Sequence, residues 1–192
     1  MIERIREALE NFTFLGPREI YRIASISTFK TFKKGDYIIQ TGELNYNGIL
    51  VIKGLLKSIV INEDGEERII LFIPEKKYAG SSHTILRNKP SIETIIAIED
   101  SIVIMFDDRR LWKLAKDSPS ILLLHNKKMK ELLAEAIDQV WFHLVLTPEQ
   151  RYHRFLKEFP LLEQRITQKD LASYLGITAT SLSRMRARIA KS

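Results

Sequence analysis

The hydrophobic period changes along this chain, and that change limits what it can fold into more than any other feature. Between Thr28 and about Asp107, short β-branched runs are separated by Gly, Asp-Gly and Pro. Such runs, at roughly ten-residue spacing, predict an all-β barrel or sandwich. From Ser118, which precedes a proline, apolar residues recur instead at threes and fours up to Leu144. This second pattern predicts one long helix, so an α+β chain is expected.

Helical patterns also precede the β-rich region, in residues 1–27. The apolar positions form one stripe before Pro17 and another after it, and both are expected to pack on the β domain: Ile2, Ile5, Leu9 and Phe12, then Ile20, Ile23 and Ala24. Within the β-rich region, Asp64-Gly65 between two β-branched runs predicts a tight hairpin.

The last 26 residues, from Thr167 to Ser192, have the pattern of two short helices joined by a sharp turn. Thr167 and Thr178 are residues of the type that caps helix N-termini, and Asp170 gives the first helix a weaker capping box. Gly176 stands where a helix commonly ends in a left-handed residue. Apolar residues at helical spacing define the inner face: Leu171, Ala172, Leu175, Leu182, Met185 and Ile189.

The outer face of the second helix carries small hydroxyl groups followed by guanidinium groups. Thr180, Arg184 and Arg188 are four residues apart, so they lie on one side of the helix. This arrangement suits a helix that enters the DNA major groove with its N-terminus first. The alternative is an ordinary helical hairpin with a solvated basic face. The residues expected to contact DNA are Thr167, Gln168, Lys169, Thr178, Thr180, Ser181, Arg184, Arg186 and Arg188, of which Thr180, Ser181 and Arg184 would address base edges.

The formal net charge of +6 is concentrated at the C-terminal end. Residues 147–192 contain nine Lys and Arg against four Asp and Glu, a net charge of +5, whereas residues 1–146 carry only +1. This asymmetry favours a polyanionic partner for the C-terminal segment.

Composition excludes several other classes of protein. Cysteine is absent, which excludes disulfides and thiolate metal sites. No window approaches 18 uncharged apolar residues, so no membrane span is expected. The N-terminus lacks the apolar stretch of a signal peptide, and a cytoplasmic location is predicted.

The predicted long helix exceeds what either neighbouring domain needs. Its apolar residues favour a homodimer paired through residues 118–144, with a helix lying on its own barrel as the alternative. Thr147-Pro148-Glu149-Gln150 is a capping box with proline at the first helical position, and it marks a hinge. Three parts are therefore expected: an effector-binding-like domain at 1–117, a dimerisation helix and hinge at 118–146, and a DNA-binding domain at 147–192.

Several motifs occur in a fixed order through the β-rich region. They are Lys34-Gly35-Asp36-Tyr37-Ile38, Thr41-Gly42-Glu43, Gly48-x5-Gly54, Asp64-Gly65-Glu66-Glu67, Ala79-Gly80 and Ile95-x-Ala97. With the order of the three parts, they resemble the cyclic-AMP receptor protein / fumarate–nitrate regulator (Crp/Fnr) family of bacterial transcription factors, and the combination looks like its divergent Bacteroidetes-type branch. The resemblance covers about Phe29 to Ile189. It implies a jelly-roll-like, cyclic-nucleotide-binding-like β barrel and a winged-helix-like helix-turn-helix with the wing short or absent. The implied partners are double-stranded DNA, with RNA polymerase as a further candidate.

Departures from the family pattern affect the effector. In cyclic-nucleotide-binding members, a Gly-Glu pair holds the ribose and a later arginine pairs with the cyclic phosphate. Here Gly80 is followed by serine, and Glu93 lies in the segment that should carry the arginine. A partly buried phosphate needs a bidentate cation or several amide donors, so cyclic AMP is not expected. The expected effector pocket is Gly80, Ser81, Ser82, His83, Ser91 and Thr94; the effector itself stays unknown, and no cofactor or metal is predicted.

The recognition helix also departs from the family. Arg184 matches the family's base-contacting arginine, but the acidic residue that helps many members to read cytosine is missing from Ala179-Thr180-Ser181. The family's usual operator is therefore not expected.

Two other functions compete with DNA-binding regulation. Metal-dependent cupin-like enzymes share this barrel architecture but need two or three clustered histidines. Of His83, His125, His143 and His153, only His83 lies in the β region, so no catalytic residue is assigned and the chain is not expected to be an enzyme. A β domain that binds a different small molecule or a protein partner is the second alternative, in which His83 serves as a sensor or haem ligand or simply as a hydrogen-bonded surface residue.

Overall fold

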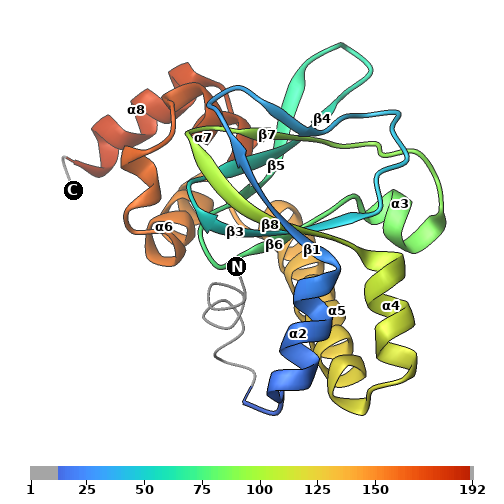
Figure 1. Cartoon of the computed structure of the whole chain (residues 1–192). Coiled ribbons are helices and arrows are strands. Elements are labelled where there is room, and N and C mark those ends of the chain that lie inside the picture. Colours follow the sequence, from blue (N-terminus) through green and yellow to red (C-terminus); the bar gives the residue numbers. More distant parts are fainter. Residues whose placement is uncertain (1–12, 191–192) are drawn as a thin grey trace. The chain divides into compact units, whose positions relative to one another are not determined.

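The computed structural model describes residues 13–190, and the predicted α+β class is confirmed (Figure 1). The helices are α2 (Pro17–Ser25), α3 (Ser82–Arg87), α4 (Asp108–Lys116), α5 (Pro119–Val145), α6 (Pro148–Glu158), the 3-10 helix η1 (Leu162–Gln164), α7 (Gln168–Tyr174) and α8 (Ala179–Ile189). The strands are β1 (Ser27–Phe32), β2 (Tyr37–Ile39), β3 (Asn47–Lys53), β4 (Leu56–Ile61), β5 (Glu67–Ile73), β6 (Tyr78–Ala79), β7 (Thr94–Ala97) and β8 (Ser101–Asp107). The stripe predicted at Ile2, Ile5, Leu9 and Phe12 lies outside the described residues.

Contacts divide the chain into two compact units. The first extends to Ile59 and resumes over Phe72–Glu131. The second combines Val60–Leu71 with the chain from Leu132 onward. The C-terminal half of α5 therefore packs with the predicted DNA-binding region, whereas the sequence places a boundary at Thr147.

The strands form two four-stranded sheets, in the orders β1-β8-β3-β6 and β2-β7-β4-β5. Strands far apart in the chain pair antiparallel, as β1 does with β8 and β4 with β7. This non-sequential order is that of the jelly-roll-like barrel expected from the family resemblance. The predicted hairpin is present: Gly65 donates its N–H to the Asn62 carbonyl at 3.0 Å, with a φ of +78° that glycine adopts without strain.

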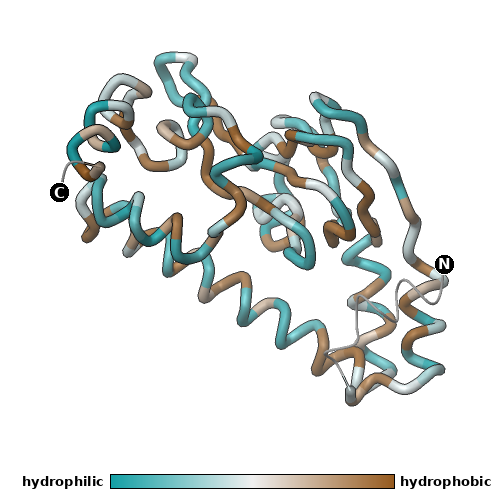
Figure 2. Tube along the Cα trace, turned by 90° about the vertical axis from the view of Figure 1, so that its left-hand side faces the viewer, coloured by the Kyte–Doolittle hydropathy of each residue, from teal (hydrophilic) through white to brown (hydrophobic). Residues whose placement is uncertain are grey.

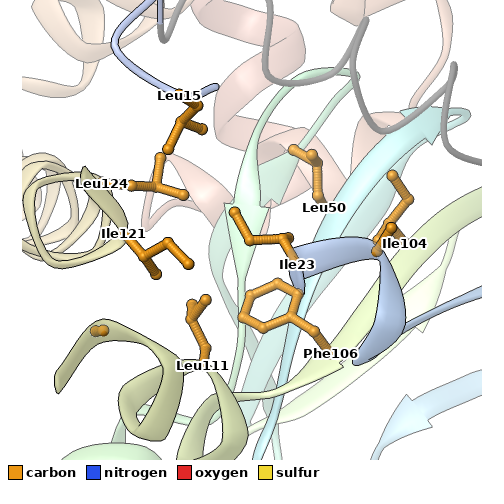
Figure 3. Packing of buried hydrophobic residues seen from close by; sticks show 10 residues of the cluster. Leu15, Ile23, Leu50, Ile104, Phe106, Leu111, Ile121 and Leu124 are labelled. Atoms are coloured by element: carbon orange, nitrogen blue, oxygen red, sulfur yellow. The ribbon is translucent and has the colours of Figure 1, made fainter. Parts of the chain in front are cut away.

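One hydrophobic cluster of the first unit lies where helices cover the first sheet. Buried side chains from α2, β3, β8, α4 and α5 point toward one another (Figure 3). Ile23 of α2 packs with Leu50 and Phe106 of the sheet, and Ile121 of α5 is fully buried in the same cluster. The predicted packing of the stripe after Pro17 on the β domain is therefore confirmed.

Helix α5 begins as predicted, after Ser118, whose hydroxyl accepts the Ile121 N–H at 3.5 Å. Hydrophobic residues recur between hydrophilic ones along its whole length (Figure 2). Within residues 13–190, no helix is both long and apolar enough to span a bilayer.

Candidate nucleic-acid interface

Helices α6, α7 and α8 begin at side-chain caps that the sequence predicts. Thr147 and Gln150 form the complete capping box: the threonine hydroxyl accepts the Gln150 N–H at 3.3 Å, and the glutamine carbonyl accepts the Thr147 N–H at 2.9 Å. Thr167 caps α7 by accepting the Asp170 N–H at 3.0 Å. Thr178 caps α8 by accepting the Ser181 N–H at 3.1 Å. These caps fix where each helix starts, because each satisfies an N–H that has no partner within its helix.

The turn between α7 and α8 depends on Gly176, whose φ is +69°. Its N–H donates to the Ser173 carbonyl at 3.1 Å, and the next N–H, from Ile177, donates to the Ala172 carbonyl at 3.0 Å. This left-handed exit from α7 lets the chain reverse at once into α8. The two helices are therefore joined by the sharp turn that the sequence pattern predicts.

Burial separates the two faces of α8 as the sequence pattern predicts. Leu182 is fully buried and Met185 nearly so, together with Leu171 and Ala172 of α7. Thr180, Ser181 and Arg184 are exposed on the opposite side. Two further residues of this face, Ser183 and Ala187, are exposed but were not predicted to lie in the interface. They are three and seven residues after Thr180, so helical spacing alone places them on the same side of the helix.

The three arginines of α8 lie in different environments. Arg184 is exposed, and among residues 13–190 no carboxylate forms an ion pair with it. Arg186 is instead half-buried: it pairs with Glu163 of η1, and its Nε donates to the Tyr152 hydroxyl at 3.2 Å. Arg188 pairs with Glu149 at the start of α6 but keeps an exposed side chain. Arg184 is thus accessible from outside, and Arg188 stays exposed beside its ion pair, whereas Arg186 is used within the fold.

The start of α7 is a second exposed polar surface in the same unit. Gln168 and Lys169 are exposed beside the first-turn amides, and Thr167 adds a hydroxyl that also donates to the Asp170 carboxylate at 2.7 Å. A lysine, an amide and free backbone N–H groups together suit the phosphate oxygens of a nucleic acid.

The predicted effector residues lie around α3 and β7 of the first unit, and most of their polar groups already have partners. Ser81 caps α3 and is fully buried. The Ser91 hydroxyl donates to the Glu93 carbonyl at 2.7 Å, and the Thr94 hydroxyl accepts the Thr41 N–H at 3.1 Å. A Cβ on Gly80 would stand 2.8 Å from the end of the Ile85 side chain and 3.1 Å from the Asn47 carbonyl oxygen, so a larger residue there would require these neighbours to move.

Glu93 occupies the polar centre of this region. Its carboxylate accepts the Ser82 N–H at 3.1 Å and the Ser58 hydroxyl at 2.8 Å. Ser58 was not among the predicted pocket residues. A serine within an otherwise apolar β-branched run was the sequence signal that could have identified it. The Glu93 carboxylate therefore already accepts the Ser82 N–H of α3, which could otherwise donate to an anionic ligand.

The histidines of the described chain do not assemble a metal site. His125 lies against Trp112, with ring centroids 5.2 Å apart, and its Nε2 is 3.8 Å from Asp108. In the part of the chain that the structure describes, no group of three or more His, Asp or Glu side chains could hold a metal ion.

Comparison with known proteins gives one family match. The model of the cyclic nucleotide-binding domain family matches residues 29–118. A comparison with curated protein sequences found no match.

Solved structures are similar over most of the chain. FixK2 from Bradyrhizobium japonicum is 20% identical, with a TM-score of 0.73, and the match covers 86% of this chain and 85% of that one. CLP from Xanthomonas campestris, described as a c-di-GMP responsive global regulator, is 14% identical with a TM-score of 0.72 and 90% of both chains covered. The catabolite activator protein of Thermus thermophilus is 21% identical, with a TM-score of 0.56, covering 94% of this chain and 86% of that one. At these identities the similarity shows the fold.

Proposed function

From the membership of residues 29–118 in the cyclic nucleotide-binding domain family and the Crp/Fnr fold of the chain, we propose that this protein is a homodimeric, DNA-binding transcription regulator. The observation that carries the proposal is the exposed face of α8. Thr180, Ser181 and Arg184 are directed outward from a helix whose inner face is buried through Leu182 and Met185. Hydroxyl and guanidinium groups on a helix of this kind can reach base edges in the major groove.

Backbone contacts would come from the start of α7. Thr167, Gln168 and Lys169 lie at a helix N-terminus, where amide dipoles favour phosphate. Arg188 adds a guanidinium at the far end of α8. We leave Arg186 out of the contact set, because its pairing with Glu163 and Tyr152 would have to break.

The second copy is proposed to pair along α5. Leu133, Ile137, Val140 and Leu144 are spaced by four, three and four residues and are between 49% and 81% exposed. This is the heptad spacing of a coiled-coil seam, and it leaves an apolar stripe uncovered within the second unit. Pairing would present two recognition helices about one helical turn, or 34 Å, apart.

Salt dependence tests the proposal for the intact protein. We expect binding to random-sequence duplexes of about 40 base pairs, which span two half-sites, with a slope of log K against log salt of about −0.9 for each phosphate contacted. Fluorescence anisotropy over a range of salt concentrations measures this slope. Absence of binding at low salt would contradict the proposed function.

The sensory domain is proposed to respond to something other than cyclic AMP. The Glu93 carboxylate holds the Ser82 N–H and the Ser58 hydroxyl, so a cyclic phosphate placed there would meet a negative charge at short range. No metabolite class is assigned, and a protein partner for the β domain is the second candidate.

Cyclic AMP is therefore expected to leave the melting temperature unchanged. A ligand present at about 100 times its Kd would stabilise the fold by about 2.7 kcal/mol, which differential scanning fluorimetry detects easily. Glu93→Gln is the matched variant, since it removes the charge and keeps the side-chain shape. A saturable rise in melting temperature for the unmodified protein would overturn the assignment.

A further inference from the structure

Arg154 of α6 pairs with Asp138 of α5 at 3.7 Å, and the end of α5 itself is bound by a second side chain of α6, Arg151. Its Nη1 donates to the carbonyl of Leu146 at 3.0 Å and to the carbonyl of His143 at 3.3 Å. These carbonyls lie at and just beyond the end of α5, where the last C=O groups of a helix have no partner within it. Arg151 itself belongs to the first turn of α6. One guanidinium thus joins the end of the long helix to the start of the next.

The same guanidinium lies beside the turn of the helix-turn-helix. A Cβ added to Gly176 would stand 3.8 Å from Arg151 Nη2 and 3.9 Å from His143 Nδ1. Burial lowers the pKa of Arg151. Burial first, and Arg151 second, lower the pKa of His143, so the imidazole favours its neutral form and adds no second positive charge. Three segments of the second unit therefore meet at this cation.

Tyr174 of α7 makes a second set of contacts with α5. The Gln139 side chain donates to the Tyr174 hydroxyl at 3.1 Å. The Tyr174 ring packs against Phe142 of α5 and Phe155 of α6, with centroids 5.3 Å and 5.8 Å apart. Apolar packing through Tyr174 holds the two parts together, and the hydrogen bonds of Arg151 add contacts with a defined direction.

We propose that Arg151 is a positioning residue for DNA binding, which fixes the orientation of α8 relative to the C-terminal half of α5. The inference rests on the proposed function, because that orientation matters only if α5 pairs two copies and α8 reads DNA. A Lys side chain offers a point charge in place of a planar fork, so it cannot reproduce the same set of directed contacts. A rotation of α8 about the joint between α5 and α6 would require these bonds to break.

The first test measures geometry without DNA. Because the chain has no cysteine, Ala134→Cys and Ala187→Cys provide two unique spin-label positions on exposed sites of α5 and α8. The labelled chain is diluted with an excess of unlabelled chain, so that distances within one chain are recorded by pulsed electron–electron resonance. We expect a narrow distance distribution in the parent, a broadened one in Arg151→Gln and Arg151→Lys, and an unchanged one in Lys157→Gln, which removes an exposed charge from the same helix.

The second test measures DNA binding by unlabelled protein that carries Arg151→Gln, Arg151→Lys or Lys157→Gln and no added cysteine. Loss of directed hydrogen bonds from a charged group is expected to weaken binding by about tenfold or more in both Arg151 variants. The salt slope should stay that of the parent, since positioning contributes no phosphate contact. Lys157→Gln should bind as the parent does.

The outcomes separate this proposal from the proposed function. A distance distribution as narrow in Arg151→Gln as in the parent overturns the positioning role, whatever the DNA result. A direct phosphate contact by Arg151 would give a different result. Arg151→Lys would then bind DNA as tightly as the parent, and the salt slope of Arg151→Gln would be lower by about one. This result would also overturn the positioning role. Broadened distances in a protein that binds no duplex would leave the joint as inferred and contradict the regulator proposal.

Discussion

Arg184→Ala is expected to reduce DNA affinity by roughly 30-fold to 20,000-fold. A bidentate arginine–guanine contact is worth about 1–3 kcal/mol, and a dimer loses two of them, so about 2–6 kcal/mol disappears. Arg184 is exposed on the outer face of α8, and truncating it removes no buried contact. Fluorescence anisotropy with a duplex selected by the parent protein measures the change, and the melting temperature should stay unaltered.

Lys157→Ala is the matched control for that experiment. It removes one positive charge from an exposed site in the same unit, on α6 and outside the set of residues proposed to contact DNA. We expect it to bind close to the parent level. If Arg184→Ala bound as tightly as the control, α8 would not be the reading helix, and the interpretation of its exposed face would be wrong.

Ile137→Asp is expected to convert the dimer into a monomer. The side chain is 49% exposed in one chain but lies at the centre of the stripe formed with Leu133, Val140 and Leu144. Burying an unpaired carboxylate in a paired seam costs at least about 3 kcal/mol per chain, so the dimer constant should fall by roughly four orders of magnitude. Sedimentation velocity measures the change, and DNA affinity should fall with it, because a monomer contacts one half-site.

His153→Asp controls for the added charge. His153 is exposed on α6, so a carboxylate there adds the same negative charge to the same unit without entering the stripe. It should remain dimeric. A parent protein that sediments as a monomer at micromolar concentration would refute pairing through α5, and the exposed stripe would then need another explanation.

Local signals predicted much of the fold correctly. The threonines at 147, 167 and 178 cap the helices that follow them, and Gly176 takes the left-handed conformation expected of a helix exit. Caps and turns depend on residues a few positions apart, so the local chain is enough to specify them.

Long-range partners could not be predicted in the same way. Arg186 and Arg184 are two residues apart and identical in type, yet Arg186 pairs with Glu163 of η1 while Arg184 faces outward. The apolar pattern of α5 likewise did not say which residues would be covered: Phe142 is buried and Leu144 is 81% exposed. These differences depend on which elements pack together, and periodicity along one helix does not contain that information.

The sequence alone therefore determined the order of the β-rich region, the long helix and the C-terminal helices, the starts of the capped helices and the side of α8 on which charge collects. It did not predict α3, which lies within the β-rich region. Period, capping chemistry and turn residues act over a few positions, and no distant partner is needed to specify them. Only the tertiary structure decided that Glu93 holds an α3 amide, that Arg151 joins α5 to α6 beside the Gly176 turn, and that Arg184 stays free of a carboxylate within the described chain. Each of these contacts joins groups on different elements, so it exists only once packing has brought those elements together.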